Sequence, residues 1–169
     1  MIIAEIYNPT QWNNFFLLIG TGSAGLTGLV FVAMTINAKH ITRDGTHVHR
    51  AMNMLTGFTA TFIVSSLALM GGQTHRTLGL EWLAVALLAT IVNTNGYIQA
   101  FRTHSSLYAL SIFRMVGGTI CYLAQIIGSL LLYSGSSTGL YISASGLVIN
   151  MCFFVSGSWL LILGTHDSD

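Results

Sequence analysis

The chain has 169 residues, of which 53% are hydrophobic and 7% are charged, and its formal net charge is +1. Soluble domains carry about 25% charged residues, so water cannot be the main solvent of this chain. The same scarcity of charge removes the electrostatic attraction that nucleic-acid binding requires. We therefore expect a single integral membrane domain over residues 1–169, surrounded by the lipid bilayer.

Five apolar blocks follow one another along the chain. At 1.5 Å per residue, a helix of about 20 to 25 residues crosses a hydrocarbon core of about 30 Å. A helix also satisfies its own backbone hydrogen bonds, which lipid cannot do. The sequence thus predicts an all-α, polytopic bundle of five transmembrane helices, at approximately residues 9–38, 50–71, 78–101, 108–133 and 139–164.

The first block contains a literal G-x-G-x-x-G, formed by Gly20, Gly22 and Gly25, which would bind a dinucleotide in a strand-loop-helix unit. No charged side chain lies between Trp12 and Ala38. Breaking this run into a strand, a loop and a short helix would leave unpaired backbone groups in lipid, at several kcal/mol each. We therefore expect one continuous helix. The alternative is an unwound segment whose carbonyls line an ion path.

Small side chains recur along the blocks at spacings that place them on one face of a helix. Lipid supplies little drive for helices to associate, so close approach at small residues favours their packing. The positions that we expect at helix contacts are Gly20, Ala24, Gly25 and Gly28 in the first block, Gly57 in the second, Gly117, Cys121 and Gly128 in the fourth, and Gly146 and Gly157 in the fifth.

Polar side chains within the blocks are candidates for a function, because each is costly in lipid unless it faces protein or water. They either form hydrogen bonds between helices or line a hydrated path. The candidates are Thr27, Thr35, Asn95, Gln99, Gln125 and Asn150. No Asp, Glu, Lys or Arg is expected at the membrane centre, which argues against a proton relay or a voltage sensor.

Most of the basic residues fall on one side of the predicted bundle. Five of the six Lys and Arg residues share that side, namely Lys39, Arg43, Arg50, Arg102 and Arg114. The positive-inside rule makes this side cytoplasmic. The N-terminus is then expected outside and the C-terminus inside.

Histidines on the predicted cytoplasmic side are weak candidates for a metal site. His47 and His49 form an H-x-H in the first loop, and His104 lies in the third connection. Two ligands close together on an irregular loop do not make a ligand set, so we expect no metal and no other cofactor. The chain also lacks Ser-x-x-Lys and H-E-x-x-H, and we expect no enzyme.

The strings GSAGLTGLVFVAMTIN, LGLEWLAVALLA, GLYISASGLVIN and SWLLILG occur in this order along the chain. Together they resemble a family of small bacterial five-helix inner-membrane proteins labelled modulator of FtsH protease. The resemblance implies a place in the bacterial cytoplasmic membrane and a regulatory partnership with a membrane-anchored, ATP-dependent protease. It supplies no catalytic or binding residues.

Three classes of function remain open. The main expectation is a non-enzymatic accessory or modulator subunit, whose glycine-rich helices pack against each other and against further copies or a membrane partner. The alternative is a homo-oligomeric channel for ions or small solutes, lined by the Thr, Asn and Gln residues, because one small chain encloses no wide path. The third class is a membrane-embedded metal enzyme that uses the cytoplasmic histidines.

Overall fold

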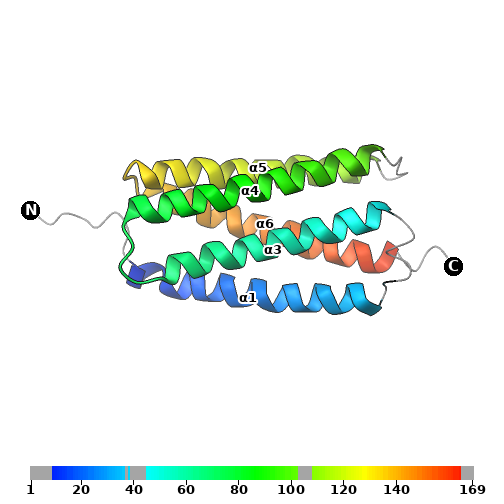
Figure 1. The fold of residues 1–169 in the computed structure, drawn as a ribbon, viewed down its shortest axis with the longest axis horizontal. Coiled ribbons are helices and arrows are strands. Elements are labelled where there is room, and N and C mark those ends of the chain that lie inside the picture. The colour runs from blue at the N-terminus through cyan, green and yellow to red at the C-terminus, as the bar shows by residue number, and fades with distance from the viewer. Residues whose placement is uncertain (1–8, 37, 39–44, 103–107, 165–169) are drawn as a thin grey trace, which may run out of the picture.

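The chain folds into five long helices, with no strand in the residues that the structure describes (Figure 1). In this computed structural model the described residues are 9–36, 38, 45–102 and 108–164. The helices are α1 (Pro9–Ile36), α3 (Gly45–Leu69), α4 (His75–Arg102), α5 (Tyr108–Tyr133) and α6 (Thr138–Gly164). All five contain a span that is long and apolar enough to cross a membrane. The predicted all-α bundle of five helices is confirmed.

Two helices begin earlier than the apolar blocks suggest. α3 begins at Gly45 rather than near residue 50, and α4 begins at His75 rather than near residue 78. The start of α4 is capped by Thr74, whose side-chain oxygen accepts a hydrogen bond from the amide of Thr77 at 3.3 Å. Helical hydrogen bonding thus continues through polar residues that hydropathy alone assigns to a loop.

α1 continues without a break through Gly20, Gly22 and Gly25. A helix pairs its backbone groups within the segment, whereas a loop would expose them. The G-x-G-x-x-G string is therefore part of a helix surface, as the absence of charge around it predicts.

α3, α4, α5 and α6 form a closed ring, and α1 lies outside it (Figure 1). Each ring helix packs against two ring neighbours; within the described residues, α3 does not pack against α5, nor α4 against α6. α1 packs only against α3 and α6 in the described part of the chain. α1 begins and α6 ends at opposite ends of the bundle (Figure 1).

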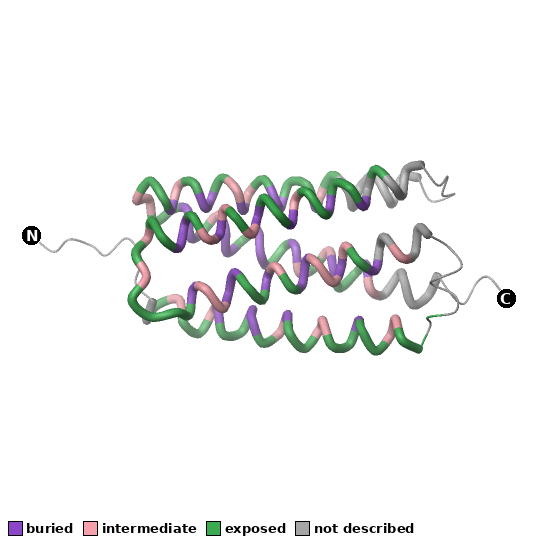
Figure 2. The backbone as a smooth tube through the Cα atoms, viewed as in Figure 1, coloured by how far each residue is buried: buried purple, intermediate pink, exposed green. Residues whose placement is uncertain are grey.

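Two apolar clusters fill the interior, one toward each end of the bundle. The Trp82 cluster consists of Phe16, Val64, Ala68, Leu78, Trp82, Leu132, Leu140 and Leu147. The Phe58 cluster consists of Val30, Ala51, Met54, Phe58, Ala89, Tyr122 and Phe154. Along α1, Phe16 belongs to the first cluster and Val30 to the second, and the buried Ser23 lies between them. Figure 2 shows that buried positions alternate with exposed ones along every helix, as expected when one side of each helix faces its neighbours.

Two glycines shape the turns at the end of the bundle where α1 begins. Gly72, between α3 and α4, has a φ of +78°, and Gly135, between α5 and α6, has a φ of +93°. At the end of α5, the amide of Ser136 donates to the carbonyl of Leu131 at 2.9 Å, and that of Gly135 to Leu132 at 3.0 Å. This pair of bonds is a Schellman motif, in which the left-handed residue is usually glycine. Gly135 therefore ends α5 and lets α6 fold back along it.

Candidate functional site: interhelical glycines and buried polar groups

Several predicted packing positions lie where two helices approach closely. The ring of Phe154 in α6 occupies the space that a Cβ of Gly57 in α3 would need. Gly117 and Gly128 of α5 are covered in the same way by side chains of α6. A Cβ at Gly146 would lie 3.1 Å from the side-chain nitrogen Nε2 of Gln125. The other two positions on these helices, Cys121 and Gly157, are also buried.

Two glycines of α4 make close contacts that the sequence analysis did not single out. A Cβ at Gly79 would lie 2.7 Å from the backbone nitrogen of Tyr133 and 3.0 Å from the carbonyl oxygen of Ser129. A Cβ at Gly96 would collide with the side-chain amide of Asn53 in α3. Both are isolated glycines in an otherwise bulky apolar segment, which is the signal that could have identified them.

The predicted stripe on α1 is divided between two faces. Gly20 faces α3, where its Cβ would lie 3.1 Å from the Cβ of Ser65. Ala24, Gly25 and Gly28 are exposed, and no atom lies within 4 Å of a Cβ built on Gly25 or Gly28. A spacing of four residues advances by about 40° around a helix, so two such steps turn Gly28 about 80° away from Gly20. Ala24, Gly25 and Gly28 therefore make no close helix contact with the described residues of this chain.

Eight of the described polar residues are buried in the helix bundle. They are Ser23, Thr61, Ser65, Asn93, Gln125, Ser129, Ser143 and Asn150. Two of them join helices: the hydroxyl of Ser23 donates to the carbonyl of Phe58 at 2.9 Å, and Gln125 Nε2 donates to the carbonyl of Ser143 at 2.6 Å. Trp82 adds a third link, because its Nε1 donates to the carbonyl of Val64 at 3.0 Å. These bonds tie α1 to α3, α5 to α6 and α4 to α3.

The six predicted polar candidates do not gather at one place. Gln125 of α5 and Asn150 of α6 are buried. Thr27 is half-buried, and its hydroxyl donates to the carbonyl of Ser23 in its own helix at 2.8 Å. The side chain of Gln99 lies outside the described residues.

The remaining two candidates, Thr35 and Asn95, face outward. Both are exposed, and the Thr35 hydroxyl donates to the carbonyl of Phe31 at 2.9 Å. The buried amide of α4 is Asn93, two positions earlier, on the opposite face of the helix. Within a single chain, Thr35 and Asn95 therefore face away from the interior of the bundle, and a role in a path between copies stays a prediction.

The predicted histidine site gains no support from the helix positions. His47 and His49 lie in the first turns of α3 rather than in a loop, and residues two apart on a helix do not face each other. Their side chains and the whole of His104 lie outside the described residues. Among the residues that the structure describes, no three His, Cys, Asp or Glu side chains are grouped to hold a metal ion.

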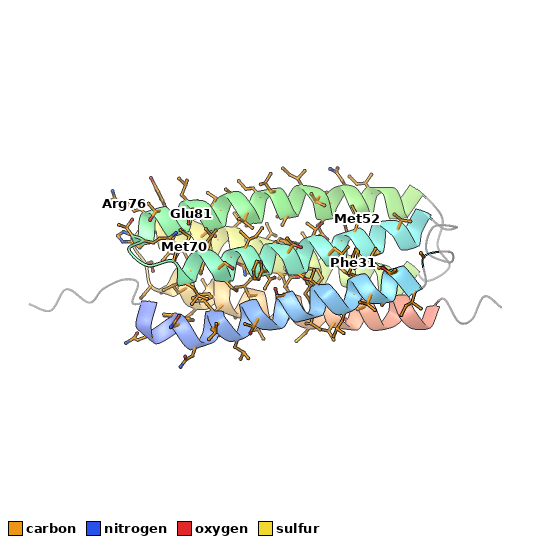
Figure 3. The ribbon with its side chains drawn as sticks, turned by 60° about the horizontal axis from the view of Figure 1, so that its bottom comes forward. Phe31, Met52, Met70, Arg76 and Glu81 are labelled. Carbon is orange, nitrogen blue, oxygen red and sulfur yellow. The ribbon has the colours of Figure 1, made fainter. Side chains whose placement is uncertain are left out.

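Charged side chains that the structure describes lie at one end of the bundle. Arg76 is exposed and Glu81 is half-buried, close to the turn between α3 and α4 (Figure 3). One carboxylate oxygen of Glu81 accepts a hydrogen bond from Gln73 Nε2 at 2.8 Å. This hydrogen bond connects the turn to α4. No charged side chain that the structure describes lies in the middle of the bundle.

The turn between α5 and α6 spells G-x-S-x-G over residues 135–139, a string that the sequence analysis overlooked. A nucleophile elbow with this string connects a strand to a helix. Here it connects two helices. Among the described residues, no hydrogen bond links Ser137 with His75 or with a carboxylate.

No protein-family model, curated protein or solved structure matches this chain. The resemblance to the modulator family consequently stays a prediction.

Proposed function

We propose that this protein is a non-enzymatic accessory subunit of a membrane assembly, which binds another transmembrane helix through the outward face of α1. The observation that supports this proposal is the open space around Gly25 and Gly28. We call the exposed residues Thr21, Ala24, Gly25 and Gly28 the small face of α1.

Glycine in the middle of a helix is about 1 kcal/mol less favourable than alanine. At Gly57 and Gly79 the chain has a reason for glycine, because any side chain would collide with a neighbouring helix. At Gly25 and Gly28 the described residues of the chain supply no such reason. A neighbouring helix that approaches to backbone contact would supply it, since small residues permit that approach in lipid.

The small face is also chemically suited to a helix rather than to a polar ligand. The Thr21 hydroxyl donates to the carbonyl of Leu17 in its own helix at 2.7 Å, so it needs no outside acceptor. Large apolar side chains flank the face, with Leu18 70% and Leu29 67% exposed. Since α1 packs only against α3 and α6 among the described helices, the described part of the chain leaves this face uncovered.

We assign the position opposite the small face to α1 of a second copy of the chain. Two copies related by a two-fold axis bring identical faces together, and a face of small residues is complementary to itself. The resemblance to the modulator family supplies the competing occupant, a transmembrane helix of a membrane-anchored protease. We further propose that the N-terminus is outside a bacterial cytoplasmic membrane and the C-terminus inside, as the positive-inside rule predicts.

The channel alternative has no observation in its favour. Gln125 and Asn150 are 6% and 3% exposed, whereas Thr35 and Asn95 lie on the outer surface. Within one chain, the buried pair and the exposed pair therefore do not lie on a common surface.

The test is the oligomeric state of purified protein in lipid bilayers, measured by single-molecule photobleaching over a range of protein-to-lipid ratios. We expect dimers that dissociate on dilution, and a much lower dimer fraction for Gly25→Leu and Gly28→Leu, because the larger side chain holds the helices apart. Leu29→Val, beside the small face, is the matched control and should dimerise normally. A wild-type chain that is monomeric at all ratios, or equal dimer fractions for all variants, would contradict the proposal.

A further inference from the structure

The interior of the α3–α6 ring contains a buried amide oxygen without a hydrogen-bond donor. Asn150 of α6 is 3% exposed, and its Oδ1 has no partner among the described residues. A buried polar atom of this kind is rare in folded proteins and requires an explanation. In a membrane-spanning bundle the cost is higher still, because bulk water does not reach the helix centre.

The register between α3 and α6 fixes what lies near this oxygen. Phe154 covers Gly57, and the hydroxyl of Ser158 lies 3.5 Å from the sulfur of Met54. Because the two helices are antiparallel, one turn beyond these contacts brings Asn150 level with Thr61, which is 2% exposed.

Thr61 cannot supply the missing hydrogen. Its hydroxyl already donates to the carbonyl of Gly57 in its own helix at 2.9 Å. The Thr61 oxygen keeps lone pairs that can accept a hydrogen bond. Asn150 Oδ1 and Thr61 Oγ1 are both oxygens that can accept a hydrogen bond at this level, so a molecule that bridges these two atoms donates twice.

The second unpartnered oxygen on α6 differs in its surroundings. Ser143 Oγ also lacks a partner, but it is pressed against Gly128 of the neighbouring helix. A hydroxyl in such close contact leaves no room for a ligand. The inference therefore concerns Asn150 and not Ser143.

The chemistry of the two groups selects the ligand. Water has two hydrogens to donate and no charge, and buried waters typically bind to polar groups that would otherwise be unsatisfied. A cation would also bind to neutral oxygens, but its charge would be buried without a counter-ion. The only described carboxylate on the ring helices, Glu81, lies at the end of the bundle and is engaged by Gln73. We propose that a water molecule bound to Asn150 Oδ1 and Thr61 Oγ1 is a permanent part of the ring interior.

Water-edited solid-state NMR on the full-length, isotope-labelled protein in bilayers tests the site directly. We expect magnetisation transfer from water to the side chain of Asn150, and its reduction in Thr61→Val, which keeps the shape of the side chain but removes an acceptor. Absence of transfer to Asn150 in the wild-type protein would overturn the proposal.

A thermal double-mutant cycle tests whether the two residues share one ligand. We expect Asn150→Leu and Thr61→Val each to lower the melting temperature by several degrees, and the double variant to lower it by less than the sum. Val148→Leu, on the exposed side of α6, is the control and should leave it unchanged. A melting temperature that rises in Asn150→Leu, or strictly additive effects, would contradict a shared water.

The same assay distinguishes water from a cation. The melting temperature of the wild-type protein is measured in sodium, potassium and choline chloride at equal ionic strength. Equal values support water. A higher value in sodium or potassium than in choline would replace water by a cation and overturn the proposal.

Discussion

Replacing Gly79 with alanine provides a direct test of the contact between α4 and α5. The added Cβ would lie 2.7 Å from the backbone nitrogen and 3.0 Å from the Cα of Tyr133, and 3.0 Å from the carbonyl oxygen of Ser129. Ordinary contacts between carbon atoms are about 3.5 to 4.0 Å long. All three neighbours are backbone atoms of a helix, so no side chain can rotate away and the two helices must separate.

The magnitude follows from two opposing contributions. Overpacking a close contact costs about 1 to 3 kcal/mol, and a gap of about 0.5 to 1 Å weakens the surrounding dispersion contacts by a quarter to a half. Alanine is favoured over glycine in a helix by about 1 kcal/mol. Gly79→Ala should therefore lower the free energy of unfolding by up to about 2 kcal/mol.

Gly25→Ala is the matched control, because it makes the same chemical change in open space. The helix-propensity contribution is common to both variants and cancels in their difference. The difference in the free energy of unfolding is then the overpacking alone, about 1 to 3 kcal/mol. Both variants are unfolded with SDS as monomers, at a large excess of detergent micelles. Equal stabilities, or a more stable Gly79→Ala, would refute the close approach of α4 and α5.

Three further outcomes are expected. Trp82→Phe removes a buried hydrogen bond to α3 and part of a large core side chain, and should lower the free energy of unfolding by about 1 to 3 kcal/mol in the same assay; an unchanged stability would count against the Trp82 cluster as a core. Gln125→Leu removes the bond to a carbonyl of α6 and should destabilise by about 0.6 to 1.7 kcal/mol, as interhelical bonds in membranes do; a gain in stability would show that this bond contributes nothing. In intact cells, an impermeant thiol reagent should label a cysteine placed at Ser136 and not one placed at Thr46, and the reverse pattern would invert the proposed orientation.

The sequence predicts the helices well because a helix that crosses a bilayer must be long enough and apolar enough for its hydrocarbon core. Each apolar block corresponds to one helix, although α3 and α4 begin earlier than their blocks, and the glycines of α1 do not interrupt that helix. Small residues also mark close contacts where a bulky partner covers them, as Phe154 covers Gly57. Both inferences depend on steric and solvation requirements that can be recognised in the sequence of a single segment.

The direction in which a helix faces is much harder to predict. In a soluble protein the buried side is the apolar side, but here the outward side is at least as apolar. Leu88 is 65% exposed on α4, whereas the smaller Ala86 is 6% exposed on the same helix. For this reason, hydropathy gave no sign that Asn93 faces inward and Asn95 outward. Similarly, the spacing of Gly20 and Gly28 cannot show that only one of them meets α3.

The hydrogen-bond partners inside the ring depend on the register between helices. Trp82 reaches a carbonyl of α3, and Ser23 of α1 reaches the carbonyl of Phe58. Each bond depends on the relative height of two segments that are separated in the sequence by a loop. Loop length does not fix that height to within one residue, so these partners emerge only from the folded structure.

The contacts of α6 close the bundle. Within the described residues, α1, α3, α4 and α5 contact only their sequence neighbours among themselves, whereas every contact between helices distant in sequence involves α6. As the nascent chain leaves the ribosome, the earlier helices can pair as successive hairpins in the membrane, but they remain an open row. The groove beside Gly57 stays in contact with lipid until Phe154 arrives. The arrival of α6 therefore converts the row of α1, α3, α4 and α5 into a closed bundle, and until then the side of α3 at Gly57 has no partner helix.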